Sequence, residues 1–158
     1  MATFDEYGNK APMKILKNQE AMKHFGQYIV LKIDLQDIRG RSYSTLFDKL
    51  AATISRLYNS FEFLKLKVTA EDASVIQQGL GCSNRGQDAP ITTQEEAFLS
   101  KSLKLLAEIL YKYYRKSIVI LVDEYDCPTN SILREISDDT ERDKALSLFR
   151  GINCIHMP

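Results

Sequence analysis

Several features that identify common classes of protein are missing from this chain of 158 residues. No apolar run approaches the roughly 20 residues that a membrane-spanning helix needs. The first residues, "MATFDEYGNKAPMK", contain no apolar core of signal-peptide length. Lys plus Arg and Asp plus Glu each number 21, so overall charge does not point to nucleic acid or an anionic membrane as a partner. We therefore expect an intracellular, cytoplasmic protein without a membrane segment.

Cysteine is scarce: Cys82, Cys127 and Cys154 lie far apart, and no C-x-x-C pair is present. An odd number of widely spaced cysteines is typical of reduced thiols in an intracellular protein, not of a disulfide framework. The hydrophobic share of 44% and the charged share of 27% are ordinary for a globular protein. The length predicts a single domain, which we assign to residues 1–158.

The phosphate-binding loop of many nucleotide hydrolases, G-x-x-x-x-G-K-[ST], is also missing. The nearest stretch is "GCSNRGQD", residues 81–88, in which Gln87 and Asp88 replace the lysine and the hydroxyl residue. A carboxylate beside a triphosphate repels it, and no strand is predicted to lead into this stretch. We interpret residues 79–90 as a turn-rich loop within an irregular segment, residues 65–92.

Hydrophobic periodicity predicts the regular elements. The segment "GQYIVLKIDLQDI", residues 26–38, alternates with Ile29, Leu31, Ile33 and Leu35 on one apolar face, which predicts a strand with one buried face. A weak apolar stripe ahead of it suggests a short helix that includes Gln19 and Met22. Residues 42–61 carry apolar side chains at spacings of three and four, which predicts an amphipathic helix capped by Ser42 or Ser44.

A second long helix is predicted to begin at a capping box, either Thr92 with Glu95 or Thr93 with Glu96. Residues 118–122 are apolar at every position, which predicts a strand covered on both faces in a parallel sheet. Residues 131–152 look helical in two pieces. This order of strand, helices and strand is typical of a right-handed crossover in an α/β fold.

The stretch "SIVILVDEYDCPTN", residues 117–130, runs from the apolar strand into Asp123 and Glu124. Ligands of open α/β sheets bind at the carboxyl ends of the strands, so these carboxylates are predicted at the mouth of a site. An apolar strand followed by Asp-Glu is the Walker B pattern, in which Asp helps to hold Mg²⁺ and Glu orients and deprotonates the attacking water. The structural alternative is that they are a helix cap or solvated loop residues.

The tract "IVILVDEYDCPTN" resembles the signature of the AAA-ATPase-like family, in which Walker B is followed by Tyr-Asp-x-Pro. Further likeness lies in "HFGQYIVLKIDLQDI", "STLFDKLAATISRLY" and "LLAEILYKYYRKSIVILVDEYD", so the resemblance covers most of residues 15–130. It implies an α/β fold, namely a partial P-loop NTPase-like three-layer sandwich with a parallel sheet. The Walker A loop and the central first strand of that fold are missing from these residues. It also implies ATP and Mg²⁺ as cofactors, with Asp123 at the metal and Glu124 as the catalytic residue.

The resemblance implies a protein related to ATP-binding and ATP-hydrolysing P-loop proteins. Without Walker A, we expect no ATP hydrolysis by the chain alone. One alternative is a non-catalytic interaction module that offers an exposed sheet edge to a partner protein or a second copy. Another is a truncated fragment of a longer ATPase. A metal-dependent nuclease that uses Asp123, Glu124 and Asp126 is disfavoured, because the usual acidic-x-Lys strand is absent.

Overall fold

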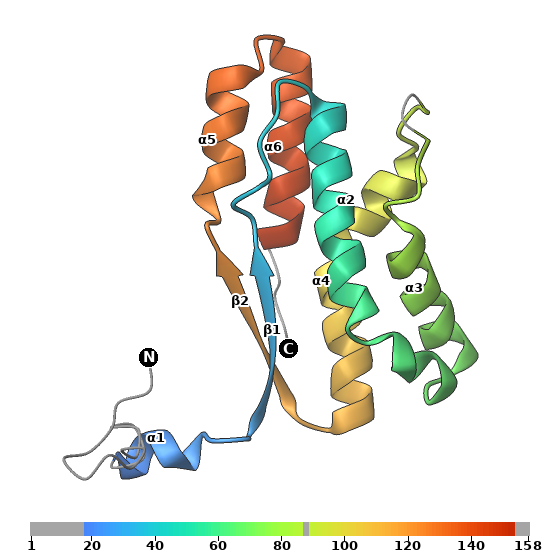
Figure 1. Cartoon of the computed structure of the whole chain (residues 1–158), viewed down its shortest axis with the longest axis vertical. Coiled ribbons are helices and arrows are strands. Elements are labelled where there is room, and N and C mark those ends of the chain that lie inside the picture. Colours follow the sequence, from blue (N-terminus) through green and yellow to red (C-terminus); the bar gives the residue numbers. More distant parts are fainter. Residues whose placement is uncertain (1–17, 87–88, 154–158) are drawn as a thin grey trace, which may run out of the picture.

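The computed structural model describes residues 18–86 and 89–153, without the side chain of Asn153. The chain forms a mixed α/β fold, in which helices stand beside a small sheet (Figure 1). The elements in chain order are α1 (Gln19–Lys23), β1 (Tyr28–Asp34), α2 (Tyr43–Asn59), the 3₁₀ helix η2 (Glu62–Leu66), α3 (Ala70–Gly81), α4 (Thr93–Tyr114), β2 (Ser117–Asp123), α5 (Asp126–Glu135) and α6 (Asp139–Asn153).

Strands β1 and β2 pair in parallel, as the sequence predicts for an α/β fold. Tyr28 pairs with Ser117 at one end of the register and Asp34 pairs with Asp123 at the other. The backbone N–H of Leu35 donates to the carbonyl of Asp123 at 3.1 Å, which extends the ladder past the end of β1. Between the two strands the chain passes through α2, η2, α3 and α4. This crossover returns the chain to the amino end of the sheet, where β2 starts beside β1.

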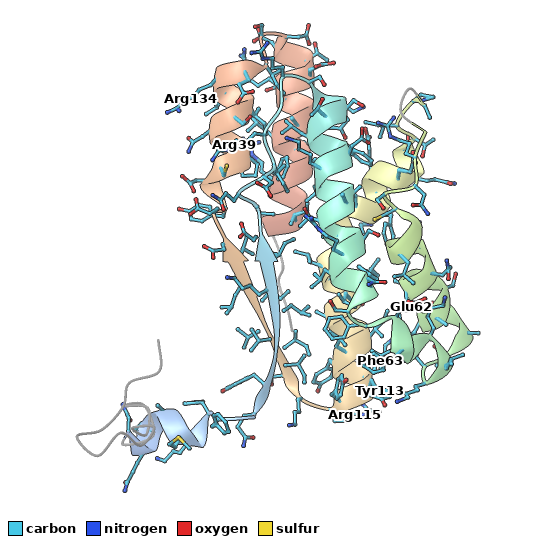
Figure 2. The ribbon with its side chains drawn as sticks, viewed as in Figure 1. Arg39, Glu62, Phe63, Tyr113, Arg115 and Arg134 are labelled. Atoms are coloured by element: carbon cyan, nitrogen blue, oxygen red, sulfur yellow. The ribbon has the colours of Figure 1, made fainter. Side chains whose placement is uncertain are left out.

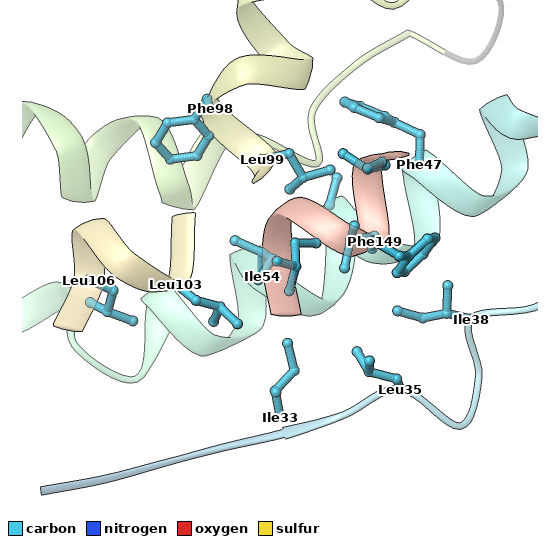
Figure 3. Close-up of a cluster of buried hydrophobic side chains, with 14 of the residues drawn as sticks. Ile33, Leu35, Ile38, Phe47, Ile54, Phe98, Leu99, Leu103, Leu106 and Phe149 are labelled. Carbon is cyan, nitrogen blue, oxygen red and sulfur yellow. The ribbon is translucent and has the colours of Figure 1, made fainter. Parts of the chain in front are cut away.

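One face of the sheet packs against the hydrophobic core. Leu31 and Ile33 of β1 are buried there, together with apolar side chains of α2, α4 and α6. Figure 3 shows how side chains from β1, the loop that follows β1, α2, α4 and α6 point toward one another; those labelled are Ile33, Leu35, Ile38, Phe47, Ile54, Phe98, Leu99, Leu103, Leu106 and Phe149. The predicted apolar faces of residues 26–38 and 42–61 are therefore confirmed as core.

The predicted helix caps are confirmed at one of the two positions offered in each case. The Ser42 hydroxyl accepts the N–H of Thr45 at the start of α2. Thr92 and Glu95 form a reciprocal capping box at the start of α4. The two predicted helical pieces near the carboxyl terminus are α5 and α6, although α5 begins earlier than expected, at Asp126.

The prediction of an irregular segment at residues 65–92 is wrong for its first half, because residues 70–81 form α3. The Thr69 hydroxyl caps this helix by accepting the N–H of Asp72. Gly79, which suggested a turn, is a packing residue: a Cβ there would lie 2.2 Å from a ring carbon of Tyr58. The Tyr58 ring is fully buried, and its hydroxyl donates to the carbonyl of Ser102 at 2.7 Å.

The prediction that β2 is covered on both faces is also wrong. Side chains of Val119 and Ile120 are only partly buried, and Leu121 is 50% exposed. The helices that contact the strands, α2 and α4, lie on the side of the buried β1 residues. Within residues 18–86 and 89–153, no element covers the opposite side, which leaves alternate apolar residues of both strands open.

Candidate active site

Two aspartates meet at the carboxyl end of the sheet. Asp34 is the last residue of β1 and Asp123 the last of β2, and the parallel register pairs them. The carboxylate of Asp123 lies 3.2 Å from the ammonium of Lys32, and both side chains are more than half exposed. The Asp34 carboxylate accepts the backbone N–H of Gln36 at 2.9 Å. The sheet therefore presents two carboxylates and one ammonium at the edge where α/β proteins bind ligands.

Glu124 follows Asp123 in an unusual backbone conformation. Its φ is 54°, in the left-handed region that favours glycine. The turn ends β2, and the Glu124 carbonyl accepts the N–H of Cys127 at 3.0 Å as α5 begins. Asp123 and Glu124 consequently face different surroundings: Asp123 pairs with Lys32, whereas Glu124 lines a cavity beside α5.

This cavity, which we call the α5 cavity, has a volume of about 220 Å³. Its lining is almost wholly polar or charged and consists of Arg39, Glu124, Asp126, Cys127, Asn130, Ser131, Arg134 and Glu135. Figure 2 shows Arg39 and Arg134 beside α5, at the end of the molecule toward which the strands point. The cavity thus combines three carboxylates with two guanidinium groups next to the end of β2.

Hydrogen bonds fix several groups of the α5 cavity. The Nε of Arg39 donates to the carbonyl of Gln36 at 3.2 Å and to the sulfur of Cys127 at 3.0 Å. The hydrogen bond to Cys127 raises the pKa of the Arg39 guanidinium. On the helix, Ser131 donates to Glu135 at 2.9 Å and accepts the N–H of Gly40 at 3.0 Å. These bonds tie α5 to the loop that follows β1.

The carboxylates fit magnesium only in combination with further ligands. Within residues 18–86 and 89–153, no group of three or more His, Cys, Asp or Glu side chains is arranged to hold a metal ion. In nucleotide sites Mg²⁺ is usually bound through one or two carboxylates, with phosphate oxygens and water as the remaining ligands. Asp123 beside Asp34 supplies donors of that kind, so the donor set suits Mg²⁺ that arrives with a phosphate ligand.

The stretch that comes nearest to a phosphate-binding loop is held by side-chain contacts to α2. The Arg85 guanidinium makes an ion pair with Asp48 at 2.7 Å and donates to the Ser44 hydroxyl at 2.8 Å. It also donates to the backbone carbonyl of Ala89. Gln87 and Asp88 lie outside the described residues. The observed contacts of Arg85 are therefore structural and favour the interpretation of this stretch as a loop.

Sequence analysis missed Asp34, Lys32 and Arg39 as parts of the site. Asp34 could have been found, because it ends an apolar strand in the same way as Asp123, and parallel strands bring such ends together. Lys32 and Arg39 carry no comparable signal: their proximity to Asp123 and Cys127 depends on the strand register and on the position of α5. Cys82 and Cys127 are free thiols, as predicted, and Cys154 lies outside the described residues.

Fold and site together define an α/β domain whose acidic residues gather at the carboxyl end of a parallel strand pair. The sequence profile of the family described as Predicted AAA-ATPase matches residues 9–152. The chain therefore belongs to this family, and the match extends beyond the stretches that suggested it. Neither curated proteins nor solved structures give a match. Among the described residues, no helix has the length and apolarity required to cross a membrane.

Proposed function

We propose that this chain supplies the Walker B carboxylates of an ATPase site and hydrolyses no ATP by itself. The observation that carries the proposal is the position of Asp123 and Glu124 at the end of β2, beside Asp34 and the α5 cavity. Membership of the Predicted AAA-ATPase family supports ATP as the ligand. These 158 residues contain no Gly-Lys-Ser/Thr tract, so the phosphate cradle has to come from residues outside them.

In this proposal Asp123 would hold Mg²⁺ through water, and the bound ion would supply positive charge beside the phosphate oxygens. The Lys32–Asp123 ion pair does not prevent this, because exposed pairs contribute only about 0–1 kcal/mol. Glu124 accepts a proton from the attacking water and orients it, as its carboxylate lines a cavity large enough for water. Arg39 and Arg134 offer guanidinium donors to phosphate oxygens, which suit such acceptors geometrically.

The experiment combines the chain with a polypeptide that carries a P-loop strand and helix, and measures bound nucleotide and released phosphate separately. Glu124→Gln should retain nucleotide and release no phosphate, since the amide cannot accept the proton. Asp123→Asn should weaken binding of ATP with Mg²⁺ but not without it. Glu135→Gln is the matched control: this carboxylate lines the same cavity but is engaged by Ser131. If all three variants behave alike, the assignment of roles is wrong.

A second candidate function is binding of a partner strand at the sheet edge. This function is favoured because β1 and β2 pair only with each other among the described residues, so each strand has one edge without a partner strand there. Unpaired N–H and C=O groups at a strand edge are a template for another strand. The test is amide hydrogen exchange along Ser117–Asp123: a bound strand should slow exchange of the β2 amides that point away from β1.

A further inference from the structure

The side of the sheet that faces away from the helices carries apolar side chains in contact with solvent. We call Tyr28, Val30, Val119 and Leu121 the outer face. Val30 is 52% exposed, Leu121 50% and Tyr28 39%, and Val119 is partly buried. In a two-stranded sheet these residues are neighbours, because Tyr28 pairs with Ser117, Val30 with Val119 and Lys32 with Leu121. The exposed apolar side chains of the outer face are therefore contiguous across both strands.

The amino end of the outer face adjoins a second exposed apolar region. Helix α1 has no buried residue, and Figure 1 shows it standing apart from the other helices, at the end where β1 begins. Met22 of α1 is 36% exposed and Phe25, which follows the helix, is 73% exposed. Lys116 ties this region to β2 by donating to the carbonyl of Gly26 at 2.8 Å. The imidazole of His24, which follows α1, shares a hydrogen bond of 2.9 Å with the hydroxyl of Tyr28, so the α1 region adjoins the outer face.

Charge is distributed unequally along this surface. The carboxyl end of the strands carries Asp34, Asp123 and Glu124, of which Asp123 is paired with Lys32. Among residues 18–86 and 89–153, the amino end carries the ammonium groups of Lys23 and Lys116 and one carboxylate, Glu20, which pairs with Lys23 at 2.7 Å. One end is therefore predominantly acidic and the other predominantly basic.

We propose that the outer face docks a second copy of this chain, with the strands of the two copies antiparallel. A twofold axis that lies in the interface and crosses the strands brings the two outer faces together. It also sets the acidic end of each copy over the basic end of the other. The twofold axis parallel to the strands would place acid on acid, which is unfavourable. This inference concerns self-association and requires no nucleotide.

The size of the surface predicts a weak dimer. Seven-residue strands are about 23 Å long, and a pair of strands is about 10 Å wide, so the sheet contributes about 230 Å² per copy. The α1 region at most doubles this area. Each copy then contributes at most about 460 Å², and the two copies together about 920 Å², which is close to the lower limit of about 1,000 Å² for specific interfaces. We therefore expect a dissociation constant on the order of 10–100 µM.

Sedimentation equilibrium of the full chain tests the proposal over concentrations of roughly 5–500 µM, a span that brackets the expected constant. A monomer–dimer equilibrium should appear, and Leu121→Lys and Val30→Lys should each weaken it at least about tenfold, since each buries an unpaired ammonium. Leu133→Lys is the matched control, because Leu133 is a 58% exposed leucine on α5, away from the outer face. It should leave the dimer unchanged. Circular dichroism of each variant establishes that it is folded.

A second measurement separates the arrangements. Raising the salt concentration should weaken the dimer, because it screens the attraction between opposite ends; a dimer that salt strengthens would contradict the antiparallel arrangement. A photoreactive residue at position 121 should crosslink two copies. A monomer at every concentration, a dimer insensitive to Leu121→Lys, or a crosslink within one chain to residues 1–17 would each overturn the proposal.

Discussion

Replacing Glu124 by glycine should stabilise the protein although it removes a candidate catalytic side chain. Glu124 has a φ of 54°, and holding a residue with a Cβ in the left-handed region costs about 1–2 kcal/mol. Glycine avoids this cost but loses more backbone entropy on folding, by about 0.5–1 kcal/mol. The difference leaves a net stabilisation of about 0.5–1 kcal/mol. The side chain is exposed, so its other contributions to stability are small.

The control is Glu124→Ala, which removes the carboxylate but keeps the Cβ and therefore the unfavourable backbone. Urea denaturation of both variants isolates the backbone effect: the midpoint for Gly should exceed that for Ala, with the same slope. In thermal denaturation the difference should be about 1–4 °C for a chain of this size. If Gly is no more stable than Ala, position 124 is not strained, and the sharp turn at the end of β2 has another cause.

Three further predictions concern packing and charge. Gly79→Ala should lower the free energy of unfolding by about 1–3 kcal/mol despite the better helix propensity of alanine, because its Cβ would overlap the Tyr58 ring. The control is Gly81→Ala, which should be neutral or slightly stabilising because nothing lies within 4 Å of the added Cβ. Equal melting temperatures for the two variants would contradict the packing of Gly79 against Tyr58. The backbone N–H of Thr92 donates to the Glu95 carboxylate and lowers its pKa. The ionised carboxylate therefore stabilises the folded protein above its unfolded pKa of about 4.3, and this stabilisation is lost as the pH falls through the lower folded pKa. Glu95→Gln should therefore lose less stability than the wild type between pH 6 and pH 2. Burial raises the pKa of the Cys82 thiol to about 11. At pH 8 this thiol should therefore react with a thiol reagent far more slowly in the folded chain than in the urea-unfolded chain. Equal reaction rates would show that Cys82 is accessible in the folded chain.

The elements that could be predicted from sequence are those whose signal is local. The alternation of Ile29, Leu31 and Ile33 indicates one buried strand face, and Thr92 with Glu95 marks the start of a helix. Helix α3 was missed because Gly79 is a turn former by propensity, whereas its role here depends on a ring from α2. The coverage of β2 was mispredicted because apolar residues at every position do not reveal which neighbours are present.

The candidate site also divides into features with a local sequence signal and features that depend on long-range contacts. Asp123 and Glu124 could be placed at the end of a strand, since an apolar run that stops at carboxylates is a local pattern. The contacts between Lys32 and Asp123 and between Arg39 and Cys127 could not, because they join residues 91 and 88 positions apart in the sequence. Such contacts depend on strand register and helix placement, which pairwise patterns in one sequence do not contain.

The most direct test of the proposed function is phosphate release from ATP and Mg²⁺ by the purified chain alone, measured beside Glu124→Gln. The proposal predicts no release above the buffer rate for either protein, because the chain has no lysine-bearing phosphate loop. Release by the wild type that disappears in Glu124→Gln would contradict it, since the chain would then contain a complete ATPase site.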